Sequence, residues 1–421
     1  MVKKLLVMMS FTVVMVLVLV ACSSDNNSGA ASGDNVTLQV VWFSDGGEGA
    51  SFERLATQYM EENDGIVIEL IEVPFNELDN TLRNMLNAGT PPAIARMINL
   101  GTFSNQLVDL FDYVGRDFEN NFGEGLQFVH DGRMIGAPMD ITANGLIYNR
   151  TAFEQAGVSV PQSENEIWNW DEWKEAMLTV MENSDVSHGL VFDRSPHRFS
   201  TLLYQAGASL LNEDLSASNF NSAQMYRTVE FFKSLHDEGI IPSSVWLGGE
   251  NPNNLFRTGQ IAMHFAGSWM IANYREEITD FEWGVTFLPY ELQRGTTPGG
   301  KYLSAFSGSG VEQEAADFIA WLSQPEINAI FVEENYFLSQ VIGNEELNFD
   351  FGSEFFEIFA LDLAATSSVP GREWGFQELT SIIQTDIRDG LEEVLAGQLS
   401  IANYLQRMDD IINDALAEIN Q

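Results

Sequence analysis

The distribution of apolar and polar residues after residue 35 alternates between strand-like and helix-like segments. Residues 36–42 (VTLQVVW) are rich in β-branched side chains and partly alternate, which predicts a strand. Residues 52–62 repeat apolar side chains at helical spacing, and residues 66–73 return to a strand pattern. This strand–helix–strand order predicts a parallel sheet, whose right-handed crossover brings the loop at 42–48 to the carboxyl edge, where ligands gather.

The remainder of the chain continues this alternation, which predicts an α/β fold. Residues 134–149 (MIGAPMDITANGLIYN) contain a proline and no helical period, so we expect an extended segment that crosses between two α/β regions. The other expected elements are helices at 76–88 and 104–110, an apolar segment at 93–98, a helix-rich stretch at 170–273, strands at 284–289 and 302–306, and helices after residue 312.

The first 22 residues have the layout of a bacterial export signal. Lys3 and Lys4 precede an apolar run at 5–20, and the segment ends in LVAC at 19–22. The run is shorter than the ~20 apolar residues of a membrane-spanning helix and a polar tract follows it, so a spanning helix is the weaker interpretation. The last four residues resemble the lipobox of bacterial lipoproteins, in which the cysteine receives a diacylglyceryl group and becomes the mature N-terminus.

Cys22 is the only cysteine of the chain, so it cannot form an internal disulfide. We expect it to carry acyl chains that anchor the protein at the extracytoplasmic face of the cell membrane, since a second acyl chain makes anchoring stable. An ordinary secretory peptide that happens to contain a cysteine is the alternative. Residues 23–35 consist mostly of Ser, Asp, Asn, Gly and Ala, a composition that predicts a flexible tether.

Length and charge restrict the classes of function. Removal of residues 1–21 leaves 400 residues, more than one compact core usually holds, so two domains are expected. The chain has 20 Lys and Arg against 61 Asp and Glu, and its net charge of −41 becomes −43 without Lys3 and Lys4. Such a charge disfavours binding to nucleic acid or to an anionic membrane surface. We interpret it as adaptation to a saline habitat, where salt screens the repulsion, with little bearing on the ligand.

Motifs for catalysis and for metal binding are weak. Residues 295–301 match G-x-x-x-x-G-K, but Tyr302 replaces the Ser or Thr that a phosphate-binding loop needs for Mg²⁺. The five histidines lack metal-ligand spacing and there is no H-E-x-x-H sequence, so neither a metal nor a cofactor is expected. A carboxylate pair for glycoside hydrolysis stays open in so acidic a chain, although no local feature singles one out.

Several short motifs occur in a fixed order along the chain. They are Trp42 after the first strand, NAGTP at 87–91, DGRMIGAP at 131–138, LIYNR at 146–150, FEQAG at 153–157, WDEW at 170–173, LFRTGQIAM at 255–263 and GSW at 267–269. Taken together, they resemble the solute-binding proteins of ABC importers, in the group that includes maltose-binding protein and other sugar-binding lipoproteins. Ala93 stands where this family usually has Asp, and Ser339-Gln340 where many members have Pro and a basic residue, which leaves the ligand contacts of these loops open.

The resemblance implies a periplasmic-binding-protein type II fold, in which hinge strands join two α/β lobes and one solute binds in the cleft between them. It places the first lobe at 36–141 plus 301–335 and the second at 142–300 plus 336–421. The crossings are expected near 139–145 and 299–304. Closure of the lobes buries the solute and creates the shape that the permease subunits recognise.

A sugar-binding cleft needs aromatic faces for the C–H surfaces of the ring and planar polar groups for its hydroxyls. Trp269 occupies the GSW position that resembles a sugar-stacking site of the family. Core packing is the alternative for each candidate, and helix or strand positions favour the core for the other five tryptophans. The four candidates lie in loops or at element ends and are Trp42, Trp246, Trp269 and Trp374.

The polar candidates are chosen because they lie in loops or in the crossover segment. A solvated surface position is the alternative for each acidic residue, and a plain turn is the alternative for the two glycines, which permit close backbone approach. The candidates are Asp45, Glu48, Asp140, Asn144, His197, Arg198, Glu250 and Arg372, together with Gly299 and Gly300.

These observations favour a non-catalytic lipoprotein, expected to be a monomer, that captures an extracellular sugar or oligosaccharide and delivers it to an ABC permease. Two alternatives remain. One is a secreted glycan-active enzyme. The other is a polyamine or peptide binder on the same fold, for which acidic and aromatic residues would enclose a cation.

Overall fold

The computed structural model describes residues 35–419 apart from 45–46, 124–125, 127 and 131. The export signal, Cys22 and nearly all of the expected tether lie outside the described residues, as does the candidate Asp45. In the described part of the chain, no helix combines the length and the apolar character needed to cross a membrane.

One eight-stranded sheet runs through the described body in the order β2-β1-β3-β10-β6-β8-β7, with β9 paired to β6. The pairs β1–β2, β1–β3 and β7–β8 are parallel, whereas β10 and β6 pair in antiparallel fashion with each other and with their other neighbours. The strands are β1 (Val36–Trp42), β2 (Ile66–Glu72), β3 (Ile94–Met97), β6 (Ala137–Asn149), β7 (His188–Val191), β8 (Ile261–Gly267), β9 (Trp283–Thr286) and β10 (Pro298–Ala305), and β4 (Val129–His130) forms a small separate sheet with β5 (Arg133–Met134).

The first lobe forms around β1, β2 and β3. The strand–helix–strand prediction for 36–73 is confirmed. The helix expected at 104–110 is wrong, because Asp109 Oδ1 accepts from the backbone of Phe111 and makes a turn that separates two short helical pieces. The helices are α1 (Glu48–Glu62), α2 (Leu78–Asn87), α3 (Phe111–Val114), α11 (Glu312–Leu322) and α12 (Pro325–Asn335), with 3₁₀ turns η1 (Phe75–Glu77), η2 (Gly101–Gln106) and η3 (Arg116–Asn121).

The second lobe forms around β7, β8 and β9. The stretch at 170–273 is rich in helices, as predicted, but it also contains β7 and β8, which the sequence analysis missed. All seven residues of β8 are buried, so no alternation marks it as a strand. The helices are α4 (Arg150–Ala156), α5 (Trp170–Asn183), α6 (Pro196–Gln205), α7 (Ala223–Asp237), α8 (Ser243–Trp246), α9 (Pro252–Arg257), α10 (Ile271–Glu277), α13 (Ser353–Ala364), α14 (Ser368–Gly375), α15 (Gln377–Leu395) and α16 (Ile401–Ile419), with 3₁₀ turns η4 (Glu164–Glu166) and η5 (Ser268–Met270).

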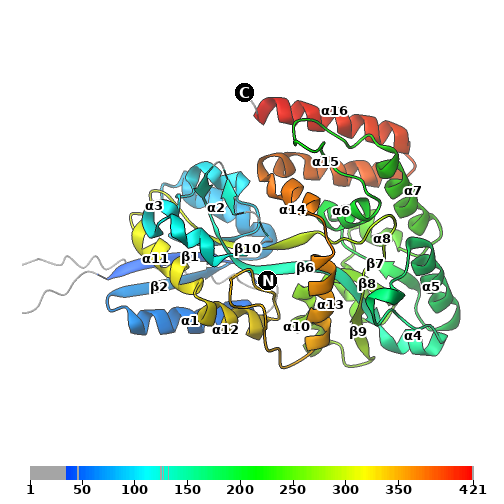
Figure 1. Cartoon of the computed structure of the whole chain (residues 1–421), viewed down its shortest axis with the longest axis horizontal. Coiled ribbons are helices and arrows are strands. Elements are labelled where there is room, and N and C mark those ends of the chain that lie inside the picture. Colours follow the sequence, from blue (N-terminus) through cyan, green and yellow to red (C-terminus); the bar gives the residue numbers. More distant parts are fainter. Residues whose placement is uncertain (1–34, 45–46, 124–125, 127, 131, 420–421) are drawn as a thin grey trace, which may run out of the picture. The chain divides into compact units, whose positions relative to one another are not determined.

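Strands β6 and β10 connect the two lobes (Figure 1). Every residue of β6 is buried, and the strand contributes Met139 to the apolar core of the first lobe and Leu146 to that of the second. The chain crosses again near Leu338, which pairs with Ile141. Phe337 packs in the first core, although the sequence-based division assigns it to the second lobe, and the remaining lobe boundaries stay predictions.

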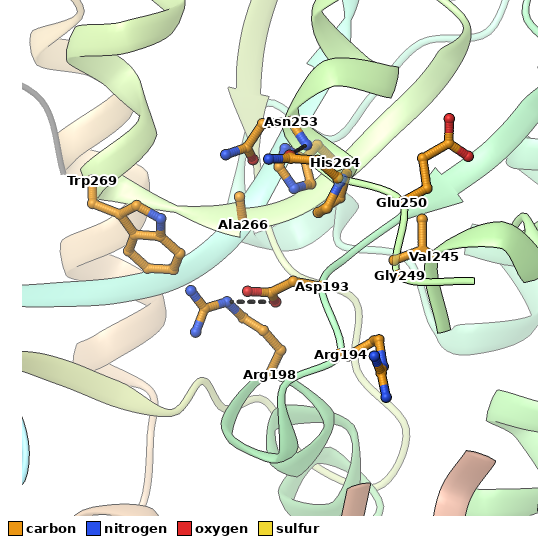
Figure 2. A pocket seen from close by; sticks show the side chains of 12 residues that line it. Asp193, Arg194, Arg198, Val245, Gly249, Glu250, Asn253, His264, Ala266 and Trp269 are labelled. Carbon is orange, nitrogen blue, oxygen red and sulfur yellow. Dashed lines mark hydrogen bonds and ion pairs between the residues drawn. The ribbon is translucent and has the colours of Figure 1, made fainter. Parts of the chain in front are cut away.

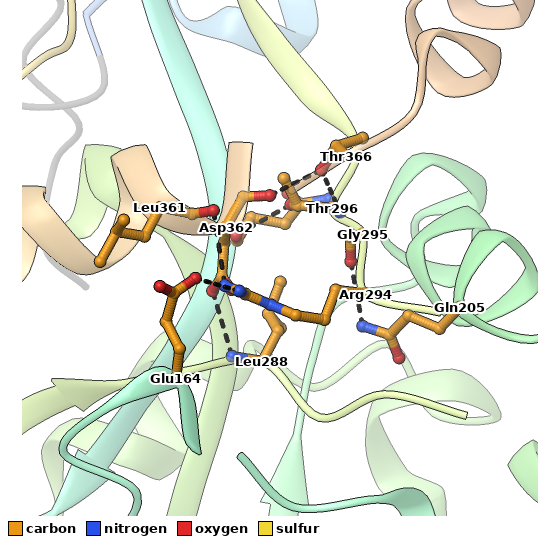
Figure 3. A network of polar contacts seen from close by, with 10 residues as sticks. Glu164, Gln205, Leu288, Arg294, Gly295, Thr296, Leu361, Asp362 and Thr366 are labelled. Atoms are coloured by element: carbon orange, nitrogen blue, oxygen red, sulfur yellow. Dashed lines mark hydrogen bonds and ion pairs between the residues drawn. The ribbon is translucent and has the colours of Figure 1, made fainter. Parts of the chain in front are cut away.

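A polar network in the second lobe holds the approach to β10 against α13 (Figure 3). Asp362 accepts from the backbone of Leu288 at 3.1 Å and pairs with Arg294 at 3.1 Å, and Arg294 also pairs with Glu164. Thr296 donates its hydroxyl to the carbonyl of Asn144 on β6 at 3.0 Å. These contacts fix the start of β10 beside β6, where both strands pass between the lobes.

Candidate ligand-binding site

A pocket of about 570 Å³ lies where β6 and β10 pass between the lobes. The first lobe contributes Phe43, Phe75 and Ile98 to its lining, and the second lobe contributes residues of α6, α14 and α15. Its volume is within the range of about 300–1,000 Å³ that is usual for small-molecule sites. The pocket is therefore built from both halves of the molecule and is large enough for a small solute.

A second pocket of about 360 Å³ adjoins the first (Figure 2). Both pockets share the side chains of Asp193, Arg194, Arg198 and Trp269. Two of the residues predicted from the sequence line this smaller pocket. The exposed Glu250 lines only the smaller pocket, whereas Trp269 lines both. The site as a whole can hold a solute larger than either pocket alone.

Trp269 is a partly exposed aromatic side chain in the turn η5 directly after β8. A Cβ atom at Gly267 would lie 2.0 Å from the indole ring, so this ring position requires a residue without a side chain there. The guanidinium carbon of Arg198 lies 4.2 Å from the centroid of the Trp269 ring. The sequence Gly-Ser-Trp thus folds the indole back over its own backbone and toward the two pockets.

Trp374 and His197 form a second aromatic wall in the larger pocket. The indole nitrogen of Trp374 donates to the Ser200 hydroxyl at 2.9 Å, and the His197 ring meets Trp374 edge-on at 4.8 Å. His197 Nε2 lies 3.1 Å from the carbonyl oxygen of Pro298. Because a carbonyl can only accept, Nε2 carries the hydrogen, and the ring is held by β10 on one side and by α14 on the other.

The imidazole of His197 is neutral at ordinary pH. Burial and the neighbouring charge of Arg198 lower its pKa to about 3, against the smaller opposing effect of the hydrogen bond to Pro298. Its Nδ1 atom has no hydrogen-bond partner among the described residues. A neutral ring with Nε2 protonated offers this nitrogen as an acceptor.

Gly299 and Gly300 line the larger pocket on β10. A Cβ atom at Gly300 would lie 2.2 Å from the carbonyl oxygen of Asp140, and one at Gly299 would lie 3.1 Å from the Thr142 hydroxyl. A side chain at 300 would therefore push β10 away from β6. The two glycines allow these strands to approach each other closely at the wall of the pocket.

Asp140 and Glu48 take part in a buried ionic cluster rather than in the pocket lining. Arg96 donates to the Phe43 carbonyl at 2.7 Å, pairs with Asp140 at 3.1 Å and lies 3.6 Å from Glu48. Lys301, which does line the pocket, lies 3.5 Å from Asp140. Asp140 and Glu48, which we expected to contact the solute, line neither pocket; they lie beside the buried Arg96, whose charge needs carboxylates next to it.

Four other candidates also lie away from the pockets. Trp42 is fully buried in the core of the first lobe and Trp246 in that of the second, and each packs against other aromatic rings there. Asn144 is buried and donates to the Thr201 hydroxyl at 3.0 Å. Arg372 is exposed and donates to the carbonyl of Glu213. Trp42 is the last residue of β1 and Trp246 the last of α8, so a position at the end of an element did not place either tryptophan in a pocket.

The apolar residues that the first lobe contributes to the larger pocket were not predicted from the sequence. Phe75 is 52 % exposed and Ile98 is 43 % exposed, and both line the larger pocket. Each follows a strand, β2 or β3, at the edge where ligands gather, so strand order contained a signal for them. The residues of α15 that line the pocket, including Gln384 and Arg388, were also not predicted, because polar residues on a helix of an acidic chain are expected to face solvent.

Among the described residues, no group of three or more His, Cys, Asp and Glu is placed to hold a metal ion. One titratable group of the smaller pocket, His264, shares a hydrogen bond of 2.6 Å with the Tyr274 hydroxyl, and burial lowers its pKa to about 3.

Two α/β lobes joined by paired hinge strands, with an aromatic pocket lined by both, define a hinged solute-binding protein. The model of the bacterial extracellular solute-binding protein family matches residues 44–329. This chain belongs to that family.

Comparisons with individual proteins agree with this assignment. A binding protein of Brucella abortus is 25 % identical over 340 residues, which cover 76 % of this chain and 79 % of that protein. The Listeria monocytogenes ABC substrate-binding protein solved with cycloalternan has a TM-score of 0.77 at 21 % identity, covering 91 % of this chain and 100 % of that one. The cyclic alpha-maltosyl-1,6-maltose binding protein of Arthrobacter globiformis has a TM-score of 0.71 at 23 % identity, over 91 % and 100 %. At these identities the two structures share the fold, and the predicted fold class is confirmed.

Proposed function

We propose that this protein captures an extracellular carbohydrate between its lobes and delivers it, unchanged, to an ABC permease. The observation that carries the proposal is the pair of partly exposed tryptophans, Trp269 and Trp374, that line one inter-lobe pocket beside polar groups. Aromatic rings bind the C–H face of a sugar, and side chains such as Gln384 and Thr142 can pair with its hydroxyls.

The similar structures support this choice of solute class. The Arthrobacter protein is named for a cyclic sugar built from maltose, and the Listeria protein was solved with cycloalternan. The pocket chemistry adds independent support, because the lining combines indole rings with hydrogen-bonding groups and includes few acids. A polyamine would need acidic partners, which makes that alternative the weaker one.

Closure of the lobes would couple capture to delivery. The side chain of Gln377 on α15 accepts from the backbone of Gly101 at 3.1 Å, and so links the second lobe to the η2 turn of the first lobe at the rim of the pocket. A solute that contacts both lobes stabilises the arrangement in which they are together, and the permease can recognise that arrangement.

The membrane attachment at Cys22 is part of the same proposal. Acylation of this residue would hold the mature protein at the extracytoplasmic face, with residues 23–35 as a tether to the permease. We propose that the protein acts there as a monomer and needs no cofactor. Metabolic labelling with a radioactive fatty acid tests the anchor, and a Cys22→Ser variant should lose the label and appear in the medium.

A panel of neutral and acidic mono- and oligosaccharides tests the solute class. We expect at least one glycan to change the tryptophan fluorescence and to raise the melting temperature, because a solute at about 100 times its Kd adds ~2.7 kcal/mol to the free energy of unfolding. If no member of a broad panel changes either signal, the carbohydrate proposal fails.

The enzyme alternative requires turnover. Incubation of the purified protein with chromogenic glycosides and with each bound glycan, followed by mass spectrometry, should recover the sugar intact. Release of chromophore or shortening of the glycan would contradict the proposal and favour a glycan-active enzyme.

A further inference from the structure

The charge of the larger pocket is opposite in sign to that of the chain. Among the described residues that line it, four are basic, namely Arg194, Arg198, Lys301 and Arg388, and one is acidic, namely Asp193. The whole chain has 20 basic residues against 61 acidic ones. An average part of this surface would be acidic, so the cationic lining requires a local reason.

The acidic partners of three of these cations do not line the pocket. In each pair the cationic residue lines the pocket and the acidic residue does not, which attracts an anion at short range even though the chain as a whole repels one. The pairs are Arg194–Glu392 at 2.6 Å, Arg388–Asp389 at 2.9 Å and Lys301–Asp140 at 3.5 Å.

Arg198 is the cation best placed to contact a solute. It lines both pockets, and its Nε atom lies 3.2 Å from Asp193 Oδ1. Neither of its terminal nitrogens donates a hydrogen bond to any described residue, and Figure 2 shows both pointing away from Asp193. Two such nitrogens side by side match the two oxygens of a carboxylate or a phosphate.

Helix α6 adds to the positive potential at the same wall. This helix has ten residues, and its first turn, Pro196 to Arg198, lines the larger pocket. The N-terminal end of a helix carries partial positive charge and attracts anions. The helix end and the Arg198 side chain thus act on the same region of the pocket.

We propose that the carbohydrate held by this protein carries an acidic group, a carboxylate or a phosphate, and that Arg198 binds this group beside Trp269. The inference rests on the proposed function and names the class of sugar. A neutral sugar would leave the two terminal nitrogens of Arg198 without an anionic partner of their own beyond Asp193 at Nε, whereas a uronic acid or a sugar phosphate supplies one on the rim of the same ring. Arg198 is therefore a specificity-determining residue.

Matched pairs of sugars test this inference by calorimetry on the purified protein. The pairs are D-galacturonate with D-galactose, D-glucuronate with D-glucose, and D-glucose 6-phosphate with D-glucose, together with the corresponding disaccharides of galacturonate and galactose. Inorganic phosphate and acetate serve as anions without a sugar. We expect an acidic sugar to bind at least roughly tenfold more tightly than its neutral partner, as hydrogen bonds to a charged group allow. Uronates and the phosphate ester separate the two anion chemistries.

Two variants at Arg198 and one control separate charge recognition from general damage. Arg198→Gln should collapse the ratio of acidic to neutral affinity toward one, and Arg198→Lys should retain part of it because the charge stays while the two terminal nitrogens are lost. Arg227→Gln removes the same charge from an exposed pair with Glu291 outside both pockets and should leave the ratio unchanged.

Three results would overturn the inference. Neutral sugars that bind as tightly as acidic ones, with a ratio that Arg198→Gln does not change, would refute it and leave carbohydrate binding in place. If phosphate or acetate binds and none of the sugars binds, the carbohydrate proposal is refuted while the anion site stands. Absence of binding to every probe would refute both.

Discussion

Residue type alone does not decide where a tryptophan lies in this protein. Trp42 is the last residue of β1 and Trp269 lies just after β8, yet Trp42 is fully buried against Phe52 with ring centroids 4.3 Å apart, while Trp269 is partly exposed in the site. The difference comes from Gly267, whose missing side chain lets the Trp269 indole fold back toward the pockets. The family motif placed Trp269 in the pocket lining, whereas position at the end of a strand misplaced Trp42.

Replacing Trp269 with alanine should weaken solute binding without unfolding the protein. The indole lines both pockets, so its removal takes away a stacking surface and lowers affinity by roughly tenfold or more. Calorimetry with the tightest-binding glycan of the panel measures the change. Trp321→Ala is the matched control, since Trp321 lies in the first lobe outside both pockets and donates to Glu62. Equal losses in the two variants would show that Trp269 acts only through the fold.

At the scale of elements, the buried cluster around Arg96 joins three strands. Arg96 on β3 pairs with Asp140 on β6, and Lys301 on β10 lies beside the same carboxylate. Both Arg96 and Asp140 are fully buried. A charge so placed is tolerated only with its partner, so this cluster should be sensitive to the loss of one member.

Asp140→Ala should destabilise the protein by ~3–5 kcal/mol, because it leaves Arg96 buried with a weaker set of partners. Urea unfolding at neutral pH, followed by tryptophan fluorescence, gives the difference. Asp237→Ala breaks the exposed pair with Lys233 and should cost less than ~1 kcal/mol. The account of the cluster is wrong if both variants lose the same small amount.

The network around Asp362 should make stability depend on pH. Burial raises the pKa of Asp362 to about 6, despite hydrogen bonds from Leu288 and Arg294 that favour its charged form. The folded state therefore binds this proton more tightly than the unfolded state, where the pKa is ~3.9. Its stabilising contribution is complete below that value and is lost as the pH rises through about 6.

Asp362→Asn should remove this dependence. Between pH 5 and 7 the wild-type protein should lose stability relative to the variant, by at most ~1.4 kcal/mol per pH unit. Urea unfolding at pH 5, 6 and 7 measures both proteins, with Asp237→Asn as an exposed control. A constant difference between wild type and Asp362→Asn across this range would contradict the assignment.

The sequence predicted secondary structure best where the spacing of apolar residues within one short segment defines the element. The β1–α1–β2 unit is one such case, and the proline-containing strand β6 was foreseen as the crossover. Strand β8 was missed because burial on both faces removes alternation. The burial of Asp140 and Glu48 beside Arg96 could not be predicted, because Arg96 is far from both in sequence. The pairing of strands in the sheet brings the three side chains together.

At the scale of the whole molecule, the pockets connect elements that the sequence separates by more than 300 residues. Phe43 lies near the start of the described chain and Arg388 near its end, and both line the larger pocket. The second-lobe residues His197, Arg198, Trp269 and Trp374 were predicted from sequence and line the pocket. The first-lobe residues and the α15 surface were not predicted: Phe75 and Ile98 are marked only by their position after β2 and β3, and polar residues on a helix surface carry no local sign of a ligand.

At the scale of the whole molecule, the negative net charge gave no indication that the charged residues lining the larger pocket are mainly basic. The excess of carboxylates over the whole chain gave no information about the solute, and its interpretation as adaptation to a saline habitat stays a prediction. The lining of the larger pocket has the opposite sign, because four of its five charged residues are basic and three of these pair with acids outside the lining. A total charge therefore describes the solubility of such a protein, and only the placement of each pair describes its binding site.

The most direct test of the central claim is a crystal structure of the protein with the glycan that binds most tightly. The account predicts an intact sugar in the larger pocket, in contact with Trp269 or Trp374 of the second lobe and with Phe75 or Ile98 of the first. A sugar bound outside the pockets that the two lobes share, or a cleaved sugar within them, would contradict it.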